Sequence, residues 1–297
     1  MDEIKVLEYI KQTANATPKY VKPVSGGLTS VIKCKTEICG QTFMVKILPG
    51  NSTRDLWYAE LNKRCNNQMA NPKMHKLFSD GNLCLLSPWI TGESLHNRLQ
   101  FATKEQIDDY AAQASEILLQ LHKNPIDYPN YQENLRNRIS GLCAKVETYG
   151  LTFPGKKTVC DYLMSVAATH TVDHVCFVHK DIRPENFVVQ DEKLYLIDFD
   201  NGSLGERASD FPYLTTMVWP EHYTFANKLI ENYVSKINAS SFWQTNLLYS
   251  TMQVVDYAIW KWEAKGKQIL IQANNLMKQY EGLTKTVPTW WSEFESK

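Results

Sequence analysis

The run His-Lys-Asp-Ile-Arg-Pro-Glu-Asn at residues 179–186 is the most informative part of the chain, together with Ile-Asp-Phe-Asp at 197–200. Between them, short apolar runs at 187–189 and 194–197 have the length and composition of β-strands. The polar residues that join these runs suit a tight turn, so we expect a hairpin. The hairpin would bring the second polar segment back beside the first.

The side chains of these two segments suit phosphoryl transfer. A hydroxyl that attacks a γ-phosphoryl group needs a carboxylate near its proton, oxygen ligands for Mg²⁺ and cations facing the phosphate oxygens. Asp181, Asn186 and Asp198 supply such oxygens, and Asn186 follows Asp181 by five positions, so one loop can present both. A plain surface turn is the alternative, but it leaves Asp198 at the end of an apolar strand without a reason.

The pattern resembles the protein-kinase-like fold, whose catalytic loop reads His-x-Asp-x-x-x-x-Asn and whose metal-binding Asp follows on the next hairpin. The resemblance implies an α+β, bilobal fold with a β-rich amino-terminal lobe, which carries one key helix, and a larger, mainly helical carboxy-terminal lobe. It makes Asp181 the catalytic base, Asn186 and Asp198 the Mg²⁺ ligands, and Arg183 a cation for the transferred phosphate. It also gives His179 a structural role in the loop.

The same resemblance implies nucleotide-binding elements near the amino terminus. Apolar and polar residues alternate from 20 to 48 between glycines, which predicts antiparallel strands. Lys46 on one strand would hold the α- and β-phosphates, and Glu60, fourteen residues later in a helix, would orient Lys46 through an ion pair. A turn over the phosphates would be formed by Ser25, Gly26, Gly27, Thr29 and Ser30.

Residues 83–90 predict a buried strand that leads from the first lobe to the second. Backbone groups around Ser87, Trp89 and Ile90 would contact the nucleotide base, although which of them do so stays open because Pro88 has no N–H. We therefore expect a nucleotide-binding lobe at residues 1–90 and a catalytic and substrate-binding lobe at residues 91–297. Thr103 and Gln106 predict a capping box at the start of a long amphipathic helix.

Three features resemble the aminoglycoside phosphotransferase and choline kinase group more than protein kinases. First, fifty-seven positions separate His122, at the end of the long helix, from His179, which leaves room for extra helices. Second, Asp200 stands where protein kinases carry a glycine. Third, Gly-Glu-Arg-Ala-Ser-Asp at 205–210 resembles a Gly-Asp-Pro-x-x-Asp element, with departures at its second and third positions; this implies a structural role for Asp210.

Composition disfavours several classes of protein. With 43% hydrophobic and 22% charged residues, the 297-residue chain can bury a core. Lys and Arg equal Asp and Glu at 32 each, so no basic excess favours nucleic acid or an anionic membrane as partner. The charged amino terminus and the lack of long apolar runs predict a cytoplasmic protein. Seven scattered cysteines indicate neither disulfides nor a zinc site.

The acceptor molecule is the least constrained part of the prediction. From residue 211 to 297 the chain has seven acidic and eight basic residues, a balance that disfavours a pocket for a polycationic aminoglycoside. Sixteen aromatic residues in the same stretch could pack in the core, bind a quaternary ammonium or stack on a sugar. Contacts from Asp200, Asp210, Asp256 or Glu263 to substrate stay open.

The sequence thus predicts a phosphotransferase that uses Mg²⁺ to move the γ-phosphate of ATP, or of GTP, to a hydroxyl of a small molecule. Aminoglycoside- or antibiotic-like, choline-like and sugar-like acceptors all fit, and we expect a monomer or a weak dimer. A protein Ser/Thr kinase is an alternative that the long insertion at 123–178 disfavours. A nucleotide-binding pseudokinase or scaffold is another, but no expected catalytic group is missing from the sequence.

Overall fold

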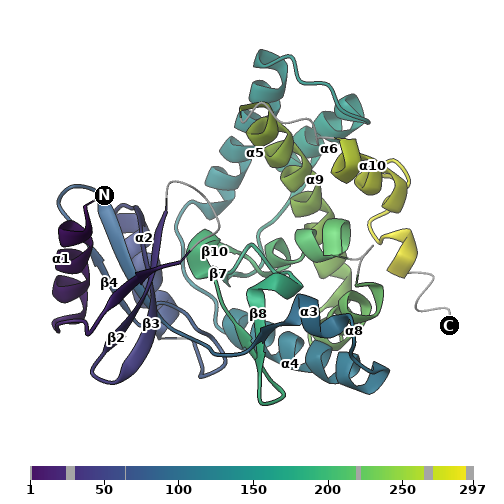
Figure 1. The fold of residues 1–297 in the computed structure, drawn as a ribbon. Helices are drawn as coiled ribbons and strands as arrows, with labels where there is room; N and C mark the ends of the chain where they lie inside the picture. Colours follow the sequence, from purple (N-terminus) through teal and green to yellow (C-terminus); the bar gives the residue numbers. More distant parts are fainter. Residues whose placement is uncertain (1, 25–30, 64, 219–221, 264–269, 292–297) are drawn as a thin grey trace. The chain divides into compact units, whose positions relative to one another are not determined.

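The computed structural model describes residues 2–24, 31–63, 65–218, 222–263 and 270–291. The chain forms two compact units (Figure 1). Unit 1 contains Met1–Phe101 and Pro184–Ser203, and unit 2 contains Ala102–Arg183 and Leu204–Lys297. This division differs from the boundary expected at residue 90, because the hairpin at residues 187–196 belongs to the amino-terminal unit.

Unit 1 is built on a five-stranded antiparallel sheet in the order β1-β2-β3-β5-β4. Its strands are β1 (Val21–Pro23), β2 (Ile32–Ile38), β3 (Gln41–Pro49), β4 (Met74–Leu77) and β5 (Asn82–Pro88). The β2–β3 hairpin turns at Cys39 and Gly40, whose φ angles of 49° and 81° are those of a left-handed two-residue turn. Helix α1 (Glu3–Ala14) packs against this sheet through a core that includes Ile10, Val45 and Leu86.

A second, three-stranded sheet in the order β6-β8-β9 completes unit 1. Its strands are β6 (Glu93–Ser94), β8 (Phe187–Gln190) and β9 (Lys193–Leu196). Unit 1 also contains helices α2 (Ser52–Asn62) and α3 (Leu95–Leu99) and the 3-10 turns η1 (Pro184–Asn186) and η2 (Phe199–Asn201). The amide of Ala70 donates to the carbonyl of Leu196 at 2.8 Å. Because β6 also pairs with β8, backbone hydrogen bonds tie the late hairpin to the first hundred residues.

Unit 2 is mainly helical. Its helices are α4 (Lys104–His122), α5 (Tyr131–Thr148), α6 (Lys156–Thr169), α8 (Tyr223–Val234), α9 (Ala239–Glu263) and α10 (Leu270–Gln279). Between them lie strands β7 (Val175–Val178) and β10 (Ser203–Glu206), which pair with each other, the 3-10 turn η3 (Arg207–Asp210) and the π-helical turn η4 (Leu214–Val218). The capping box predicted at Thr103 and Gln106 is present at the start of α4.

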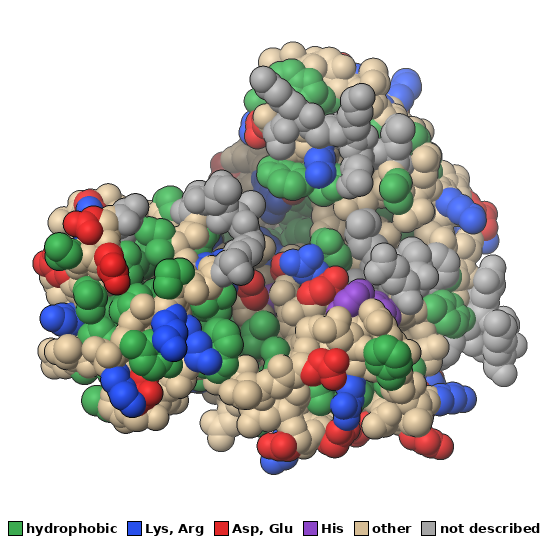
Figure 2. Space-filling model, in the orientation of Figure 1, with side chains coloured by type: hydrophobic (Ala, Val, Ile, Leu, Met, Phe, Trp, Pro, Cys, Tyr) green, Lys and Arg blue, Asp and Glu red, His purple; other side chains and the backbone are tan. Residues whose placement is uncertain are grey.

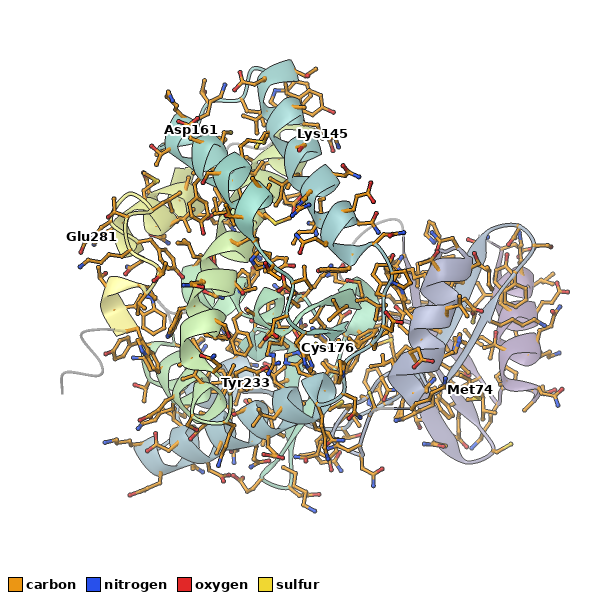
Figure 3. The ribbon with its side chains drawn as sticks, turned by 180° about the vertical axis from the view of Figure 1, so that it is seen from behind. Met74, Lys145, Asp161, Cys176, Tyr233 and Glu281 are labelled. Carbon is orange, nitrogen blue, oxygen red and sulfur yellow. The ribbon has the colours of Figure 1, made fainter. Side chains whose placement is uncertain are left out.

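The main core of unit 2 lies among α5, α6, α9 and α10. It contains Ile139 and Val146 of α5, Leu163 of α6 and Val255 of α9, all fully buried. Figure 3 shows α5, marked by Lys145, beside α6, marked by Asp161. This α+β organisation, with a β-rich first part and a mainly helical second part, agrees with the prediction.

The surface of the molecule has no dominant charge on the face shown in Figure 2. Basic and acidic side chains are interspersed over that face, in line with a formal net charge of zero. None of the helices in the described parts of the chain combines the length and the apolar character that crossing a bilayer requires.

Candidate active site

Unit 1 contains a cavity of about 350 Å³ beside β3 and the β8–β9 hairpin. Apolar side chains form most of its walls, among them Val24, Met44, Ala70, Ile90, Val188 and Ile197. Ser87 and Trp89, which were predicted to lie near a nucleotide base together with Ile90, also line the cavity. Largely apolar walls of this kind suit a planar heterocycle, with orientation left to a few polar groups.

The polar part of the same cavity is formed by Lys33, Lys46, Asp198 and Asp200. The ammonium of Lys46 lies 2.7 Å from Asp198 Oδ1 and 2.8 Å from Asp200 Oδ2. Burial alone would lower the pKa of Lys46, but the charges of Asp200 and Asp198 outweigh burial and raise it. Lys46 is therefore a charged ammonium held between two carboxylates.

Strand register places two lysines on the cavity side of the sheet. Lys46 of β3 stands directly opposite Lys33 of β2, and residues paired in this way point to the same face. Lys33 is not among the site residues predicted from the sequence. The alternation of apolar and polar residues in β2 indicates that Lys33 lies on one face of the strand, but only the register of the hairpin shows that Lys46 shares this face.

The Asp-Phe-Asp segment is positioned by the hairpin before it. The amide of Ile197 donates to the carbonyl of Asn186 at 2.9 Å, and Asp198 follows with φ of 64°. Phe199 is buried, and its carbonyl accepts a hydrogen bond from the Tyr58 hydroxyl of α2 at 3.2 Å. These contacts hold both aspartates at the polar part of the cavity.

Asp200 is a site residue whose role the sequence left open. Burial raises its pKa, the nearby ammonium of Lys46 opposes this effect, and the charge of Asp198 adds to it. The charge of Lys33, which lines the same cavity, also opposes the rise, but burial prevails. The two neighbouring carboxylates offer the hard oxygen ligands that a divalent cation prefers.

Glu60 does not provide the contact that the sequence predicted. Glu60 lies in the last turn of α2 and forms an ion pair with Lys63, the residue that caps the carboxy-terminal end of this helix. The structure describes both Lys46 and Glu60, and Lys46 pairs with Asp198 and Asp200 instead. The predicted Lys46–Glu60 ion pair is therefore not formed. The physical reason is the second aspartate, which supplies the carboxylate that the prediction assigned to α2.

The predicted turn over the phosphates, at Ser25, Gly26, Gly27, Thr29 and Ser30, lies outside the described residues.

Gly92 stands at a position of the fold where no other residue fits. A Cβ atom at Gly92, which lines the same cavity, would lie 2.2 Å from the carbonyl oxygen of Val189. Only glycine therefore lets the chain pass β8 at this distance.

The chemistry of Asn186 and Asp198 fits Mg²⁺ in part. Carboxylate and amide oxygens are the hard ligands that this ion prefers, and proteins often supply only one or two of them beside nucleotide phosphates and water. In the described ranges no group of three or more His, Cys, Asp or Glu side chains could hold a metal alone. A magnesium ion at Asp198 and Asn186 would thus need phosphate oxygens to complete its coordination.

Unit 2 carries Asp181 and Arg183, in the loop that the sequence predicts to be catalytic. Arg183 Nε lies 3.2 Å from Asp181 Oδ1, and the guanidinium also lies over the ring of Tyr213, 5.6 Å from its centre. The side chain of Asp181 is about one-sixth exposed, at 16%. The loop therefore presents a partly exposed carboxylate with a cation beside it.

Asp210 holds the backbone of this loop. Its Oδ2 accepts hydrogen bonds from the amide of His179 at 2.9 Å and from His122 Nε2 at 2.9 Å, and its Oδ1 accepts from the amide of Lys180. Burial alone would raise the pKa of Asp210, but the hydrogen bond from His122 and the charges of His122 and His179 hold it below its ordinary value. Asp210 is thus the anchor of the catalytic loop.

Other charged groups of unit 2 have contacts of their own. Burial, and next the charge of Arg138, lowers the pKa of Lys180 to about 8. Asp256 forms an ion pair with Arg138, and Glu263 accepts a hydrogen bond from the Tyr149 hydroxyl at 3.1 Å.

Comparison with solved structures shows the same fold in aminoglycoside phosphotransferases. The gentamicin complex of APH(2")-IIa is 18% identical with a TM-score of 0.64, and the match covers 96% of this chain and 99% of that one. The GDP complex of wild-type aminoglycoside 2'-phosphotransferase-IIIa is 17% identical with a TM-score of 0.61, and the match covers 93% of this chain and 97% of that one. Spectinomycin phosphotransferase APH(9)-Ia in complex with ADP and spectinomycin is 14% identical with a TM-score of 0.60, and the match covers 99% of this chain and 94% of that one. No curated protein sequence matches the chain.

The sequence itself matches a family model. Residues 46–234, well over half of the chain, match the model of the phosphotransferase enzyme family. The matched segment begins at Lys46 and includes Asp181, Asn186, Asp198 and Asp210. The protein therefore belongs to the phosphotransferase enzyme family, as a small-molecule kinase with a hydroxyl group as acceptor.

Proposed function

We propose that this kinase uses Mg²⁺ to transfer the γ-phosphate of ATP, or of GTP, to a hydroxyl of a small molecule that is not a polycation. The observation that supports nucleotide binding is the cavity of unit 1, which has largely apolar walls and, in its polar part, Lys46, Asp198 and Asp200. The apolar part suits a purine base, and Lys46 suits the α- and β-phosphates. Ser87, Trp89 and Ile90 line this cavity, and backbone groups of this segment would contact the base.

Lys46 is proposed to exchange partners during binding. Asp198 and Asp200 pair with its ammonium, and their charges raise its pKa and keep it charged. Nucleotide phosphates would replace a carboxylate as the partner of the ammonium. Mg²⁺, when bound by Asp198 and Asn186, would neutralise the β- and γ-phosphate oxygens.

Asp181 is proposed as the base. Its carboxylate accepts the proton of the acceptor hydroxyl as the oxygen–phosphorus bond forms and the bond to the bridging oxygen breaks, which leaves a nucleoside diphosphate. Arg183, whose Nε lies 3.2 Å from Asp181 Oδ1, supplies a cation for the transferred phosphate. Asp210 fixes the loop backbone that carries both side chains.

The charges of unit 2 limit the acceptor. An aminoglycoside carries several ammonium groups and calls for clustered carboxylates. Near the catalytic loop this chain has instead the cations Lys180, Arg183 and Arg138, and Arg138 already takes the carboxylate of Asp256. A neutral, sugar-like hydroxyl compound suits this charge distribution best, ahead of choline-like and aminoglycoside-like compounds.

A nucleoside-diphosphate release assay tests this proposal. ATP and GTP are each offered with a panel of sugars, choline, ethanolamine, macrolides and aminoglycosides, and a compound-dependent signal identifies the acceptor. Asp181→Asn should abolish that signal while calorimetry shows retained nucleotide binding. The matched control is Asp161→Asn, at an exposed aspartate paired with Lys157, which should keep full activity. Full activity of Asp181→Asn, or a signal only with aminoglycosides, would contradict the proposal.

A further inference from the structure

A second cavity, of about 330 Å³, lies in unit 2 and involves none of the residues assigned to the reaction. It is lined by the end of α4, the segment before β7, turn η3 and the end of α8. Three of its side chains are permanent cations, Lys123, Arg207 and Lys236, and one is a carboxylate, Glu116. The cavity therefore has a net positive charge.

The three cations have no carboxylate partner in the parts of the chain that the structure describes. Lysines 123 and 236 are exposed and can be hydrated, whereas Arg207 is partly buried. A guanidinium withdrawn from water without a partner is costly, because it loses hydration and gains no ion pair. Arg207 is therefore the group in this cavity with the strongest need for an anion.

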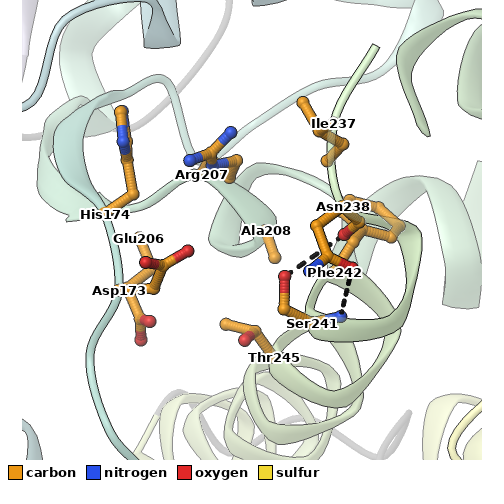
Figure 4. Close-up of a pocket in the computed structure, with 10 residues that line it drawn as sticks. All are labelled: Asp173, His174, Glu206, Arg207, Ala208, Ile237, Asn238, Ser241, Phe242 and Thr245. Atoms are coloured by element: carbon orange, nitrogen blue, oxygen red, sulfur yellow. Dashed lines mark hydrogen bonds between the residues drawn. The ribbon is translucent and has the colours of Figure 1, made fainter. Parts of the chain in front are cut away.

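The two carboxylates that line a cavity together with Arg207 do not meet that need. Figure 4 shows a smaller adjoining cavity of about 50 Å³, in which the guanidinium of Arg207 lies apart from the carboxylates of Glu206 and Asp173. Glu206 instead accepts hydrogen bonds from His170 Nε2 at 2.8 Å and from the Tyr249 hydroxyl at 3.0 Å. The carboxylate of Glu206 is thus already hydrogen-bonded to groups other than Arg207.

A helix terminus adds to the positive potential of this region. Asn238 and Ser241, at the start of the 25-residue helix α9, line the smaller cavity that Arg207 shares. The amino-terminal end of a helix carries a partial positive charge and favours anions. The helix terminus and the three cations therefore act in the same direction.

From these observations we infer that Arg207, Lys123 and Lys236 form a second binding site in unit 2, for the phosphate group of a small molecule or for inorganic phosphate. The planar fork of Arg207 can bind two phosphate oxygens at once, and the two lysines add charge around it. This site is separate from the nucleotide cavity, whose residues all belong to unit 1.

The cavity is connected to the catalytic loop through its wall. His122 and Tyr233 line it, and His122 Nδ1 is hydrogen-bonded to the Tyr233 hydroxyl at 2.7 Å. The other ring nitrogen of His122 holds Asp210, which in turn holds the amides of His179 and Lys180. A bound phosphate that orders this wall should therefore stabilise the loop that carries Asp181.

Calorimetry with two probes tests the binding site. Inorganic phosphate and glycerol phosphate are titrated into the whole protein at constant ionic strength, with and without saturating ADP to occupy the nucleotide cavity. We expect binding that persists with ADP and that weakens at least about tenfold in Arg207→Gln. Lys104→Gln, which removes an exposed cation of α4 outside the cavity, should bind like the wild type. The tighter of the two probes tells free phosphate from a phosphate ester.

Hydrogen exchange measures the connection to the loop. Bound phosphate should slow exchange of the amides of His179 and Lys180 in the wild type but not in Arg207→Gln. Equal binding by the wild type and Arg207→Gln, or no binding, would overturn the site, and binding that leaves these two amides unchanged would overturn the connection. Neither readout needs the acceptor, so failure here is distinct from failure of the proposed phosphotransfer.

Discussion

Two regions of this protein use aspartates in opposite ways. In unit 1, Asp198 and Asp200 have side chains that are 32% and 19% exposed, and both hold the ammonium of Lys46. In unit 2, Asp210 has no exposed side-chain surface and holds two backbone amides and an imidazole. Asp198 and Asp200 share one lysine side chain, which we propose exchanges a carboxylate for nucleotide phosphate, whereas Asp210 is held by two backbone amides and an imidazole. The contrast is thus between proposed binding groups and a structural anchor.

The pKa shifts of these aspartates differ in the same way. Burial raises the pKa of Asp200 although the charges of Lys46 and Lys33 oppose it. Burial acts on Asp210 too, but the hydrogen bond from His122 and the charges of His122 and His179 more than compensate, and the pKa of Asp210 falls. The aspartate beside the cavity is thus partly uncompensated, whereas the aspartate that holds the loop is fully compensated.

The largest effect is expected at the anchor. Asp210→Asn removes the charge that His122 and the amides of His179 and Lys180 share, and should lower the free energy of unfolding by about 3–5 kcal/mol. A lowered carboxyl pKa stabilises the fold above the ordinary aspartate pKa of about 4 and loses this effect as pH falls through the folded value. Urea unfolding between pH 7 and about pH 2 should therefore show a difference that is nearly constant down to about pH 4 and shrinks below it.

The control for this variant is Asp161→Asn, which removes an exposed carboxylate paired with Lys157. It should change the free energy of unfolding by less than about 1 kcal/mol. Equal losses in the two variants would mean that Asp210 is no anchor and that the two regions do not differ as argued.

A smaller effect, of opposite sign, is expected at Lys180. Its pKa of about 8 lies below the ordinary lysine value, so between about pH 8 and 10.5 the unfolded chain binds more protons and stability rises with pH. At pH 7 the buried charge destabilises the fold. Lys180→Met should therefore raise the free energy of unfolding by about 1–3 kcal/mol at pH 7 and remove the rise at alkaline pH.

Lys157→Met gives the matched comparison, because Asp161 raises the pKa of this exposed lysine. Thermal unfolding from pH 7 to 10.5 should show no stabilisation for it. If both variants unfold alike, the charge of Lys180 is accommodated by the fold and the loop carries no electrostatic strain.

The next effect concerns the exchangeable pair. Asp198→Asn leaves Lys46 with Asp200, so the free energy of unfolding should change by less than about 1 kcal/mol. The Mg²⁺-dependent part of nucleotide affinity should nevertheless fall at least about tenfold, because a hard oxygen ligand becomes a neutral amide. Calorimetry with and without Mg²⁺ measures this. Asp200→Asn serves as the control with a smaller metal effect, and a reversed order would exchange the proposed roles of the two aspartates.

The sequence predicted the features that depend on local spacing. The loop with Asp181 and Asn186, the hairpin that carries Asp198 and the capping box of Thr103 all follow from short-range patterns. It could not predict the partner of Lys46, because Glu60 and Asp200 were both carboxylates at suitable positions and only packing selects between them. Likewise, Lys33 depends on hairpin register.

The smallest effect tests the same contrast within one helix. Helix α4 ends at His122, which is locked to Asp210, and begins at Thr103, whose hydroxyl accepts from the Gln106 amide at 3.3 Å while Gln106 Oε1 accepts from the Thr103 amide at 3.0 Å. Because Thr103 is exposed, water can replace its hydroxyl, and Thr103→Ala should cost about 1 kcal/mol in urea unfolding. A double-mutant cycle with Gln106→Ala should give a coupling below that value. A larger loss, with weaker amide protection at His179, would mean that strain at the exposed end reaches the anchor.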